Sequence, residues 1–524
     1  MNWPKSDKDH LIVTSAQMEG FEQEIFSKGM PVQALMEKVG LGMRDWILAN
    51  PEIINAGVIV LVGPGHNGAD GLVLARELFL AGVKVSVWCP FQKKKELTNK
   101  HLSYCNWIGI QQLQTAPDVM KKNLWIDALF GIGQTRPMPS DIEHLLHSRQ
   151  EFQPGKLISL DVPSGICSDT GKLLSQYAAR ASFTLTVGLI KQGLLQDSAL
   201  PNVGKLVIID IGFPQTFFSK TCKGFPLKIS SEDFSSLPFP KLIANLNKYQ
   251  RGRTLVLAGS DQYLGATILA LKGALASGVG TINAVVPRAI AKSLWEVVPE
   301  VVITGLIETS LNGKALLGES LVSQKLDQFD TLLVGPGLGL CEEECDDPQD
   351  MLSNFEGLLV LDADGINRLS QSKEGWKWLL KRKGQTWLTP HRKEFNRLFP
   401  ELIDLEPFEA SSVAAGMTRA GILLKGANTV IADPFGSKWQ LSNTASYSAR
   451  IGLGDVLAGF LGGFGALSIS GEKGLEENSL AVGAFLHAES AKKCSEGTSA
   501  SAISSFLGKL VQELQSGKCV QKHT

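Results

Sequence analysis

Three segments in the first half of the chain place polar side chains at the ends of apolar runs. Asn67 and Asp70 follow the run VIVLV, Asp127 lies in LWIDALF, and Asp161 and Ser164 end the run KLISLDVPSG. Each of these residues alone is most simply interpreted as a turn or helix cap. Together, however, oxygen-bearing side chains at three neighbouring strand ends could bind a hard cation, while one carboxylate transfers a proton.

The segment from Gly63 to Gly68 has the spacing G-x-G-x-x-G, which by itself would suggest a dinucleotide held at a helix N-terminus. The next apolar run, VKVSVWCP, ends without the acidic residue that would bind the ribose hydroxyls. We therefore interpret the loop as part of an oxygen-rich site. Its candidate cation ligands are Asn67, Asp127 and Ser164, and this choice leaves Asp161 free for proton transfer.

The second half contains a loop, Gly452-Leu-Gly454-Asp455, whose glycines open a predicted helix. Backbone N–H groups and the helix dipole at such a position favour negative charge. Asp455 could then deprotonate or orient a hydroxyl while the amides stabilise a transferring phosphoryl group. Alternatively, Asp455 only stabilises the first helical turn. His391 directly follows a predicted strand, at the same expected edge as Asp455.

Three further segments of the second half end predicted strands. The segment Lys425–Thr429 could present amides, an ammonium and a hydroxyl to nucleotide phosphates. The turn Gly335–Gly339 leaves its backbone accessible because three of its five residues are glycine. Asp362 and Asp364 could contribute to a Mg²⁺ shell or cap the next helix, and capping is the favoured interpretation.

The elements that must position these residues form a repeating pattern. Apolar runs alternate with helical or loop stretches in both halves, which predicts parallel sheets with helices on their faces. Thr14–Gln17 has the pattern of a capping box, and Pro31 begins a second helix. Open α/β sheets bind ligands at the carboxyl ends of their strands, so the fold class predicts that the candidate residues of each half converge.

The 524 residues are enough for two large domains. A Pro- and Ser-rich interval from Phe213 to Lys241 has neither periodicity, and we place the boundary near Pro226, giving domains 1–225 and 226–524. The 51 basic and 52 acidic residues give a net charge of -1, which argues against dedicated nucleic-acid binding. Scattered cysteines and the lack of a leader or a long apolar stretch lead us to expect a soluble, cytoplasmic protein without membrane partners.

The motifs GPGHNGADGLVLAR, DALFGIGQTRP and LDVPSG resemble those of the NAD(P)H-hydrate epimerase family, named for the YjeF N-terminal module, over roughly residues 10–225. The resemblance implies that K⁺ is bound by Asn67, Asp127 and Ser164, and that Asp161 is the catalytic acid or base. The implied substrate contacts are His66, Asn67, Gly68, Ala69, Asp70, Gly131, Ile132, Gly133, Gln134, Thr135, Arg136, Pro137 and Asp161.

The motifs KYQRGRTLVLAGS, YLGAT, VGPGLG, LDADGIN, LTPHRKEF, KGANT and GLGDVLAG resemble the ADP- or ATP-dependent NAD(P)H-hydrate dehydratases of the ribokinase-like superfamily, over about residues 245–515. The resemblance implies a catalytic Asp455, with Mg²⁺ accompanying ADP or ATP. The implied substrate contacts are Ala266, Gly337, His391 and Asp455. The implied nucleotide contacts are Lys425, Gly426, Ala427, Asn428, Thr429 and Gly454.

Together the resemblances predict two Rossmann-like three-layer α/β domains, the first of YjeF type and the second ribokinase-like. They imply a repair enzyme that interconverts the R and S hydrates of NADH and NADPH and dehydrates the S form through a phosphate ester. We expect small-molecule partners and a homo-oligomer. Two alternatives remain: a dehydratase whose first domain is a binding module, and a ribokinase-like kinase that stops at the phosphate ester.

Overall fold

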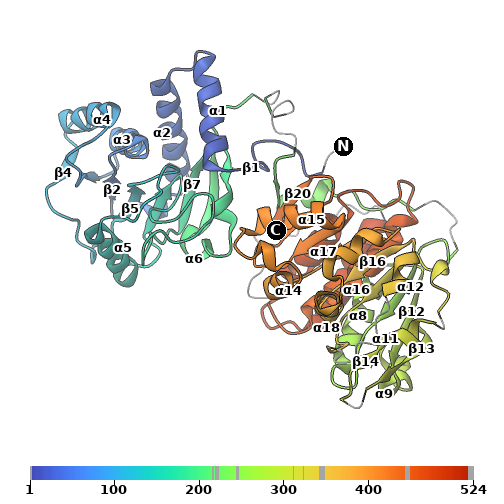
Figure 1. Ribbon diagram of the computed structural model, residues 1–524. Coiled ribbons are helices and arrows are strands. Elements are labelled where there is room, and N and C mark those ends of the chain that lie inside the picture. Colours follow the sequence, from blue (N-terminus) through green and yellow to red (C-terminus); the bar gives the residue numbers. More distant parts are fainter. Residues whose placement is uncertain are drawn as a thin grey trace. The chain divides into compact units, whose positions relative to one another are not determined.

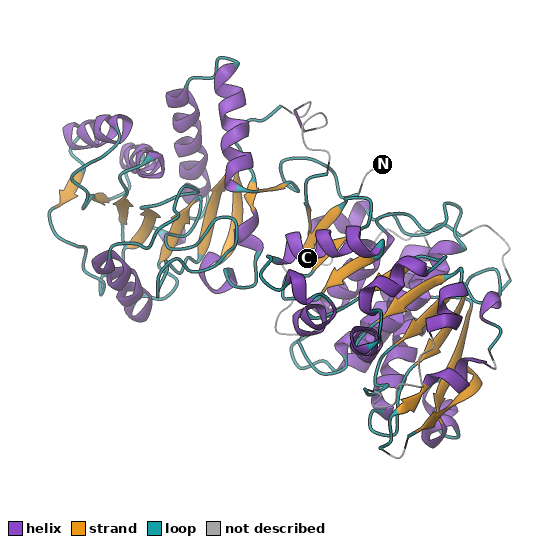
Figure 2. Ribbon diagram, viewed as in Figure 1, coloured by secondary structure: helices purple, strands orange, loops and turns teal. Residues whose placement is uncertain are grey.

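The structure is a computed structural model that describes residues 3–214, 217–218, 224–242, 247–310, 312–322, 324–340, 349–442 and 449–516. The chain forms two compact units, which divide between Pro226 and Leu227, and Trp3 and Pro4 belong with the second unit. Helices flank both faces of the sheet in each unit (Figures 1 and 2). The predicted two-domain, three-layer α/β architecture is therefore confirmed. Among the described residues, no helix is both long and apolar enough to cross a membrane.

The first unit contains a seven-stranded sheet in which every neighbouring pair of strands is parallel. Its strands, in spatial order, are β4 (Gln111–Leu113), β3 (Val85–Trp88), β2 (Val58–Val62), β5 (Leu124–Ala128), β6 (Leu157–Leu160), β7 (Phe183–Val187) and β9 (Lys205–Ile209). The apolar runs VIVLV, VKVSVWCP, LWIDALF and KLISLDVPSG each contain a strand of this sheet, as does the further run LVIIDIG. Two strands, β4 and β7, were not predicted.

The helices of this unit are α1 (Ser15–Ser27), α2 (Val32–Leu48), α3 (His66–Leu80), α4 (Glu96–Trp107), α5 (Ser140–Phe152) and α6 (Leu200–Val203). Thr14 caps α1 with the predicted reciprocal bonds: the Thr14 hydroxyl accepts from Gln17 N at 3.2 Å, and Gln17 Oε1 accepts from Thr14 N at 2.9 Å. Strand β1 (Ile12–Val13), which precedes α1, pairs with β8 (Ile190–Lys191), the strand that follows β7. This pairing connects the residues just before α1 to the segment that follows β7.

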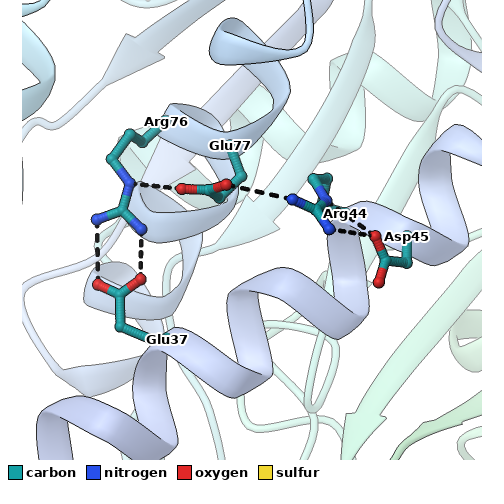
Figure 3. Close-up of polar contacts among 5 residues, drawn as sticks. All are labelled: Glu37, Arg44, Asp45, Arg76 and Glu77. Carbon is teal, nitrogen blue, oxygen red and sulfur yellow. Dashed lines mark hydrogen bonds and ion pairs between the residues drawn. The ribbon is translucent and has the colours of Figure 1, made fainter.

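A network of charged side chains joins α2 to α3 (Figure 3). The Arg76 guanidinium donates to both carboxylate oxygens of Glu37 and, through Nε, to Glu77 Oε1 at 2.8 Å. Arg44 donates to the other oxygen of Glu77 at 3.3 Å and also pairs with Asp45. The Arg76 side chain is only 14% exposed, so solvent screens this network less than an ordinary surface ion pair. It stabilises the position of α3, which begins in the glycine-rich loop.

The second unit contains an eleven-stranded sheet. Its strands, in spatial order, are β10 (Leu227–Ile229), β20 (Lys438–Leu441), β19 (Val430–Ala432), β18 (Gly421–Leu424), β17 (Thr386–Leu388), β16 (Leu358–Leu361), β15 (Thr331–Val334), β11 (Arg253–Leu257), β12 (Thr281–Pro287), β13 (Val302–Thr309) and β14 (Ala315–Leu316). The strands from β18 to β13 are parallel to one another, whereas β19 and β14 run antiparallel to their neighbours. The interval without periodicity, from Phe213 to Lys241, contains β10.

The helices of this unit are α8 (Leu264–Ala276), α9 (Arg288–Ala291), α10 (Leu294–Val297), α11 (Leu317–Val322), α12 (Gln349–Asn354), α13 (Asp364–Gln371), α14 (Arg392–Leu398), α15 (Pro407–Thr418), α16 (Leu453–Ile469), α17 (Ser479–Lys493) and α18 (Ala500–Gln515). Helices α8 and α16 pack backbone to backbone. A Cβ on Gly459 would lie 1.8 Å from Ala270 O, and one on Gly273 would lie 2.1 Å from Val456 O. Only glycine permits this approach, which fixes α16 and the loop before it.

We expect Arg76→Gln to loosen the contact between α2 and α3. Removing a largely buried guanidinium from two carboxylates should cost about 1–2 kcal/mol, which corresponds to roughly tenfold faster amide exchange in these two helices. Hydrogen exchange on the full chain measures this change. Lys100→Gln is the matched control, because Lys100 pairs with Glu96 while both side chains are well exposed. Equal exchange rates in the two variants would contradict a stabilising role for the Arg76 network.

Candidate functional site

A cavity of about 600 Å³ lies at the carboxyl edge of the first sheet, where β2, β5 and β6 end and α3 begins. Eight residues predicted from the sequence line it: His66, Asn67, Asp70, Gly131, Ile132, Gly133, Gln134 and Asp161. Helix α1 contributes further lining residues that sequence analysis did not identify, among them Glu19 and Glu22. The remote segments expected to converge in this half do meet at one cavity.

Five predicted substrate contacts do not line this cavity. Ala69 is fully buried and clusters with Val73 of the same helix and Met36 of α2. Gly68 packs against the end of β2, where a Cβ would lie 2.1 Å from Gly63 O. The segment Thr135–Pro137 is exposed to solvent. The methyl group of Ala69 therefore belongs to the core, and the structure places no substrate-facing side chain at that position.

Asp127 is completely buried and accepts four hydrogen bonds. Ser159 Oγ and Ser164 N donate to Oδ2, both at 2.9 Å, while Ser164 Oγ at 2.6 Å and Leu129 N at 3.2 Å donate to Oδ1. Burial raises the pKa of Asp127, and the groups that oppose this shift are all neutral hydrogen-bond donors. Asp127 is thus a carboxylate held by neutral groups, and it does not cap a helix.

Asn67 is connected to Asp127 and Ser164 through Phe130. Asn67 Nδ2 donates to Phe130 O at 3.0 Å, and Phe130 N donates to Ser164 Oγ at 3.1 Å. The three candidate cation ligands, Asn67, Asp127 and Ser164, therefore belong to one hydrogen-bonded network. Neither Asp127 nor Ser164 caps a helix, whereas Asp127 does accept from the N–H of Leu129 two residues on, as a turn residue would.

Asp161 follows β6 with a left-handed backbone, at φ +64°. Its Oδ1 accepts from Lys191 Nζ at 2.6 Å and from Val187 N at 3.2 Å, and Lys191 is only 1% exposed. Sequence analysis did not predict this partner, a buried ammonium that β8 brings beside Asp161. Its Oδ2 lies near the cavity wall, 3.4 Å from where a Cβ on Gly131 would be. Hydrogen bonds therefore hold Oδ1 of Asp161, whereas Oδ2 lies toward the cavity.

Sequence analysis missed both Lys191 and Glu22. Lys191 had a usable signal, since it is a lone charged residue in the apolar segment VGLIKQGLL. Glu22 had no such signal in the sequence, because it is one of several acidic residues on α1. Burial and the charge of Asp161 raise the pKa of Glu22 to about 7, and Lys191 partly opposes this shift. Burial and the charges of Asp161 and Glu22 also raise the pKa of Asp70 well above its usual value.

The second group of candidate residues meets at the carboxyl edge of the second sheet. Asp362 follows β16 and Lys425 follows β18, and Lys425 Nζ lies 2.7 Å from Asp362 Oδ1. Thr389 Oγ1, from the segment after β17, donates to the same oxygen at 2.7 Å. The residue at the N-cap of α13 is Ala363, and Asp364 Oδ2 accepts instead from Gly339 N at 2.8 Å. The capping interpretation of Asp362 and Asp364 was therefore wrong.

Asp455 lies in the first turn of α16, which begins after Gly452 with φ +87°. The ammonium of Lys425 lies next to this turn, 3.6 Å from where a Cβ on Gly454 would be. Burial, followed by the charges of Asp362 and Asp364, raises the pKa of Asp455 to about 7, while Lys425 opposes the shift. Perturbed carboxyl groups of this kind are typical of functional sites.

Two more predicted substrate contacts are neighbours, since a Cβ on Gly337 would lie 2.7 Å from Ala266 Cβ. The turn that contains Gly337 also packs against β16, because a Cβ on Gly335 would lie 1.8 Å from Asp362 O. The predicted nucleotide segment forms the turn between β18 and β19, where the hydroxyl of Thr429 donates to Gly426 O at 3.2 Å. These contacts join the glycine-rich turn to the edge that holds Lys425.

His391 caps α14. Its Nδ1 accepts from the backbone N–H groups of Lys393 and Glu394 at 3.1 and 3.3 Å, and its Nε2 lies 3.1 Å from Glu394 Oε1. Burial and then the charges of Lys425 and Arg397 lower the pKa of His391. His391 bridges to Lys425 through the backbone and so lies at the predicted edge, where its half-exposed ring remains accessible.

Comparison with known proteins matches both units. Residues 32–193 match the family described as YjeF-related protein N-terminus, and residues 254–513 match the family described as NAD(P)H-hydrate dehydratase. A bifunctional NAD(P)H-hydrate repair enzyme from Synechocystis sp. is 39% identical over 461 residues, covering 86% of this chain and 85% of that protein. The chain belongs to the bifunctional NAD(P)H-hydrate repair enzyme family.

A second member of this family, from Gloeobacter violaceus, is 37% identical over 457 residues, covering 86% of this chain and 88% of that protein. Among solved structures, the ADP/ATP-dependent NAD(P)H-hydrate dehydratase from Bacillus subtilis co-crystallised with ATP and Mg²⁺ is 25% identical. It aligns with a TM-score of 0.43, covering 54% of this chain and 96% of that one. The family match to residues 32–193 includes Asp161 and Lys191 but begins after Glu22.

The raised pKa of Asp455 predicts a pH-dependent cost in stability. The folded state keeps this proton up to about pH 7, whereas an unperturbed carboxyl releases it near 3.8, so stability falls as the pH rises between these values. We expect Asp455→Asn to unfold at a higher temperature than the wild type, by more at pH 8 than at pH 5. Thermal unfolding at both values checks this. The exposed Asp404→Asn should show no such difference between the two pH values, and equal shifts for Asp455→Asn would contradict the raised pKa.

Proposed function

We propose that this chain repairs hydrated nicotinamide cofactors. The first unit interconverts the R and S hydrates of NADH and NADPH, and the second returns the S hydrate to NAD(P)H at the expense of ADP or ATP. Family membership across both units supports the proposal. The observation that carries it is that one chain holds both residue sets, each at the carboxyl edge of its own sheet.

In the first unit, the cavity would hold the hydrate between α1, the start of α3 and the segment Gly131–Gln134. Asp161 is the proposed acid or base, since Lys191 anchors Oδ1 and leaves Oδ2 toward the cavity. This arrangement suits a group that accepts a proton from substrate.

Potassium fits the network of Asn67, Asp127 and Ser164. Asp127 is a fully buried carboxylate whose hydrogen bonds come from neutral donors, so a monovalent cation would balance its charge. Amide, hydroxyl and carboxylate oxygens are also the ligands that hard cations prefer. When bound, the ion would supply a fixed positive charge that stabilises anionic groups of the substrate.

In the second unit, Asp455 is the proposed base. It takes the proton of the ring hydroxyl while the oxygen bonds to the terminal phosphorus of the nucleotide, and the bond to the departing nucleotide breaks. Backbone N–H groups at the start of α16 would stabilise the transferring phosphoryl group. Asp362 holds Lys425 beside this turn. The phosphate then leaves with the C–O electron pair, and loss of a neighbouring proton restores the dihydropyridine.

Magnesium would enter with the nucleotide. Within the described residues, no group of three or more His, Cys, Asp or Glu side chains is arranged to hold a metal ion. The proposed steps therefore rest on Asp455, Lys425 and the loop amides. We also propose the domain assignment 1–225 and 226–524, the listed nucleotide contacts from Lys425 to Thr429 with Gly454, and the homo-oligomeric, cytoplasmic state expected from the sequence.

Two alternatives would give different products. A first unit that only binds would leave the R hydrate unchanged, but the anchored Asp161 in an open cavity favours catalysis. A second unit that acts as a small-molecule kinase would release a stable phosphate ester instead of phosphate and NAD(P)H. Product analysis separates these outcomes from the proposed repair reaction.

Separate substitutions should disable the two activities independently. With mixed hydrates and ADP or ATP, we expect Asp455→Asn to lower NAD(P)H formation on the order of 10²-fold or more, because a general base is lost. Asp161→Asn keeps the left-handed backbone accessible and should stop consumption when the S hydrate is used up. Ultraviolet absorbance and chromatography of the epimers measure both effects. Full consumption of the mixed pool by Asp161→Asn would contradict the proposed role of Asp161.

Potassium binding should be measurable without an activity assay. We expect KCl to raise the unfolding temperature of the full chain more than NaCl at equal ionic strength, because the folded state alone offers the site. Asp127→Asn should abolish the difference between the salts, since it removes the charge that the ion balances. Ser159→Ala is the matched control: it removes a hydrogen bond to Asp127 but no proposed ligand. A potassium effect that persists in Asp127→Asn would contradict the site.

A further inference from the structure

Helix α1 places a carboxyl group in the cavity of the first unit that belongs to none of the sequence motifs. Glu22 lines the cavity together with Asp70 and Asp161. Glu22 lies near the start of the unit's sequence, whereas Asp161 follows β6 much later in the chain. The cavity therefore brings together two carboxyl groups from independently positioned elements.

The register of α1 is fixed by several contacts. Ser15 N and Ser15 Oγ donate to the two oxygens of Asp169 at 2.6 and 2.7 Å. Met18 is fully buried, and the ring of Phe21 packs against those of Phe213 and Phe225, at centroid distances of 6.5 and 5.7 Å. With these residues held in the core, the neighbouring side chain of Glu22 is directed to the cavity.

We propose that Glu22 is the general acid of the epimerase reaction and that Asp161 acts as its base. This inference rests on the proposed function of the first unit and assigns a role to a residue outside its recognised motifs. The assignment follows from the chemistry of the hydrate and from the different surroundings of the two carboxyl groups.

Hydration of an electron-rich dihydropyridine places the hydroxyl on the carbon bonded to the ring nitrogen, because nitrogen stabilises the cation through which water adds. That carbon inverts if the hydroxyl leaves from one face and water returns to the other. The reaction needs a proton donor for the departing hydroxyl and a base for the incoming water. Two carboxyl groups with different protonation states supply this pair.

The atoms balance over one turnover. The Glu22 proton passes to the hydroxyl oxygen, the C–O bond breaks, and water leaves as the nitrogen lone pair forms a C=N⁺ bond. A second water attacks the opposite face, the π electrons return to nitrogen, and Asp161 Oδ2 takes a proton from this water. Glu22 is then ionised and Asp161 protonated, and proton exchange through solvent in the cavity restores both.

The surroundings distinguish the acid from the base. Asp161 is anchored to the buried ammonium of Lys191, whereas Glu22 has no hydrogen-bond or ion-pair partner among the residues that the structure describes. The charges of Asp161 and Glu19 and burial itself raise the pKa of Glu22 to about 7, and Lys191 opposes them. Glu22 can therefore hold a proton at neutral pH and also release it.

Asp70 is the competing candidate for the acid. Burial and the charges of Asp161 and Glu22 raise its pKa well above the usual value. Asp70 lies on α3 among the predicted substrate contacts of the glycine-rich loop, and we assign it to substrate binding. The other charged or titratable side chains that line the cavity are Glu19, His66 and Lys95, and burial and Lys95 lower the pKa of His66.

The test uses the full chain and separated R and S hydrates without nucleotide, so that the second unit is idle. We expect Glu22→Gln to lower kcat/KM for interconversion on the order of 10²- to 10⁴-fold, the usual effect of losing a general acid. Glu24→Gln is the matched control, since Glu24 is an exposed glutamate of the same helix that does not line the cavity. It should behave like the wild type.

Two further readouts would not respond to a merely structural role. In the wild type, kcat/KM should fall as the pH rises above about 7, because Glu22 loses its proton, and Glu22→Gln should lack this alkaline limb. Glu22→Asp should recover part of the rate and the limb. In H₂¹⁸O, each inversion should place solvent oxygen in the hydroxyl of the product.

The outcomes separate the inference from the proposed function. A wild-type chain that does not interconvert the hydrates would overturn the epimerase function itself. An active wild type combined with a Glu22→Gln variant that keeps the rate and the alkaline limb would overturn the role of Glu22. The role of Glu22 would also be overturned if Glu22→Asp were as inactive as Glu22→Gln. It would likewise be overturned if the inverted product kept its original hydroxyl oxygen.

Discussion

A buried carboxylate–lysine pair lies at the ligand edge of each unit, Asp161 with Lys191 in the first and Asp362 with Lys425 in the second. In both places the lysine is the cation nearest to more than one carboxyl group. The lysine forms an ion pair with one of these groups, while burial and like charge act on a neighbouring carboxyl group. Asp455 is such a neighbour, with a pKa raised to about 7. Each site thus contains one ion-paired carboxylate and a neighbouring carboxyl group with a raised pKa.

The same local geometry produces both pairs. The carboxylate follows one parallel strand, and the lysine follows a nearby strand or lies just beyond one: β6 with the β7–β8 segment, and β16 with β18. Parallel strands end at a common edge, so short side chains from separate segments reach one another there. The helix that completes each site is fixed by other means. Core packing of Phe21 orients α1, and close backbone contact at Gly459 fixes α16.

Much of this could be predicted because strand periodicity and strand-end residues are local features. Apolar runs identified the central strands, and Asp127, Asp161 and Asp455 were found where those runs or a helix begin or end. Partners in space have no such local signal: the bond between Asp161 and Lys191 exists only once the chain after β7 has brought β8 close to the end of β6. Strand β7 was missed because Thr residues interrupt its apolar pattern, although the structure buries them. The cavity-facing side of α1 was missed because amphipathicity shows which side is buried, and does not show what the other side faces.

The left-handed backbone of Asp161, at φ +64°, affects how related sequences should be interpreted. Aspartate, asparagine and glycine adopt this conformation at little cost, and most other residues do not. A descendant that had lost the epimerase reaction would still tend to keep one of these three residues, because the turn itself selects for them. Retention of an acidic residue here is therefore weak evidence of activity. A lysine retained at the position of Lys191 is more informative, since a buried ammonium destabilises the fold unless an anion accompanies it.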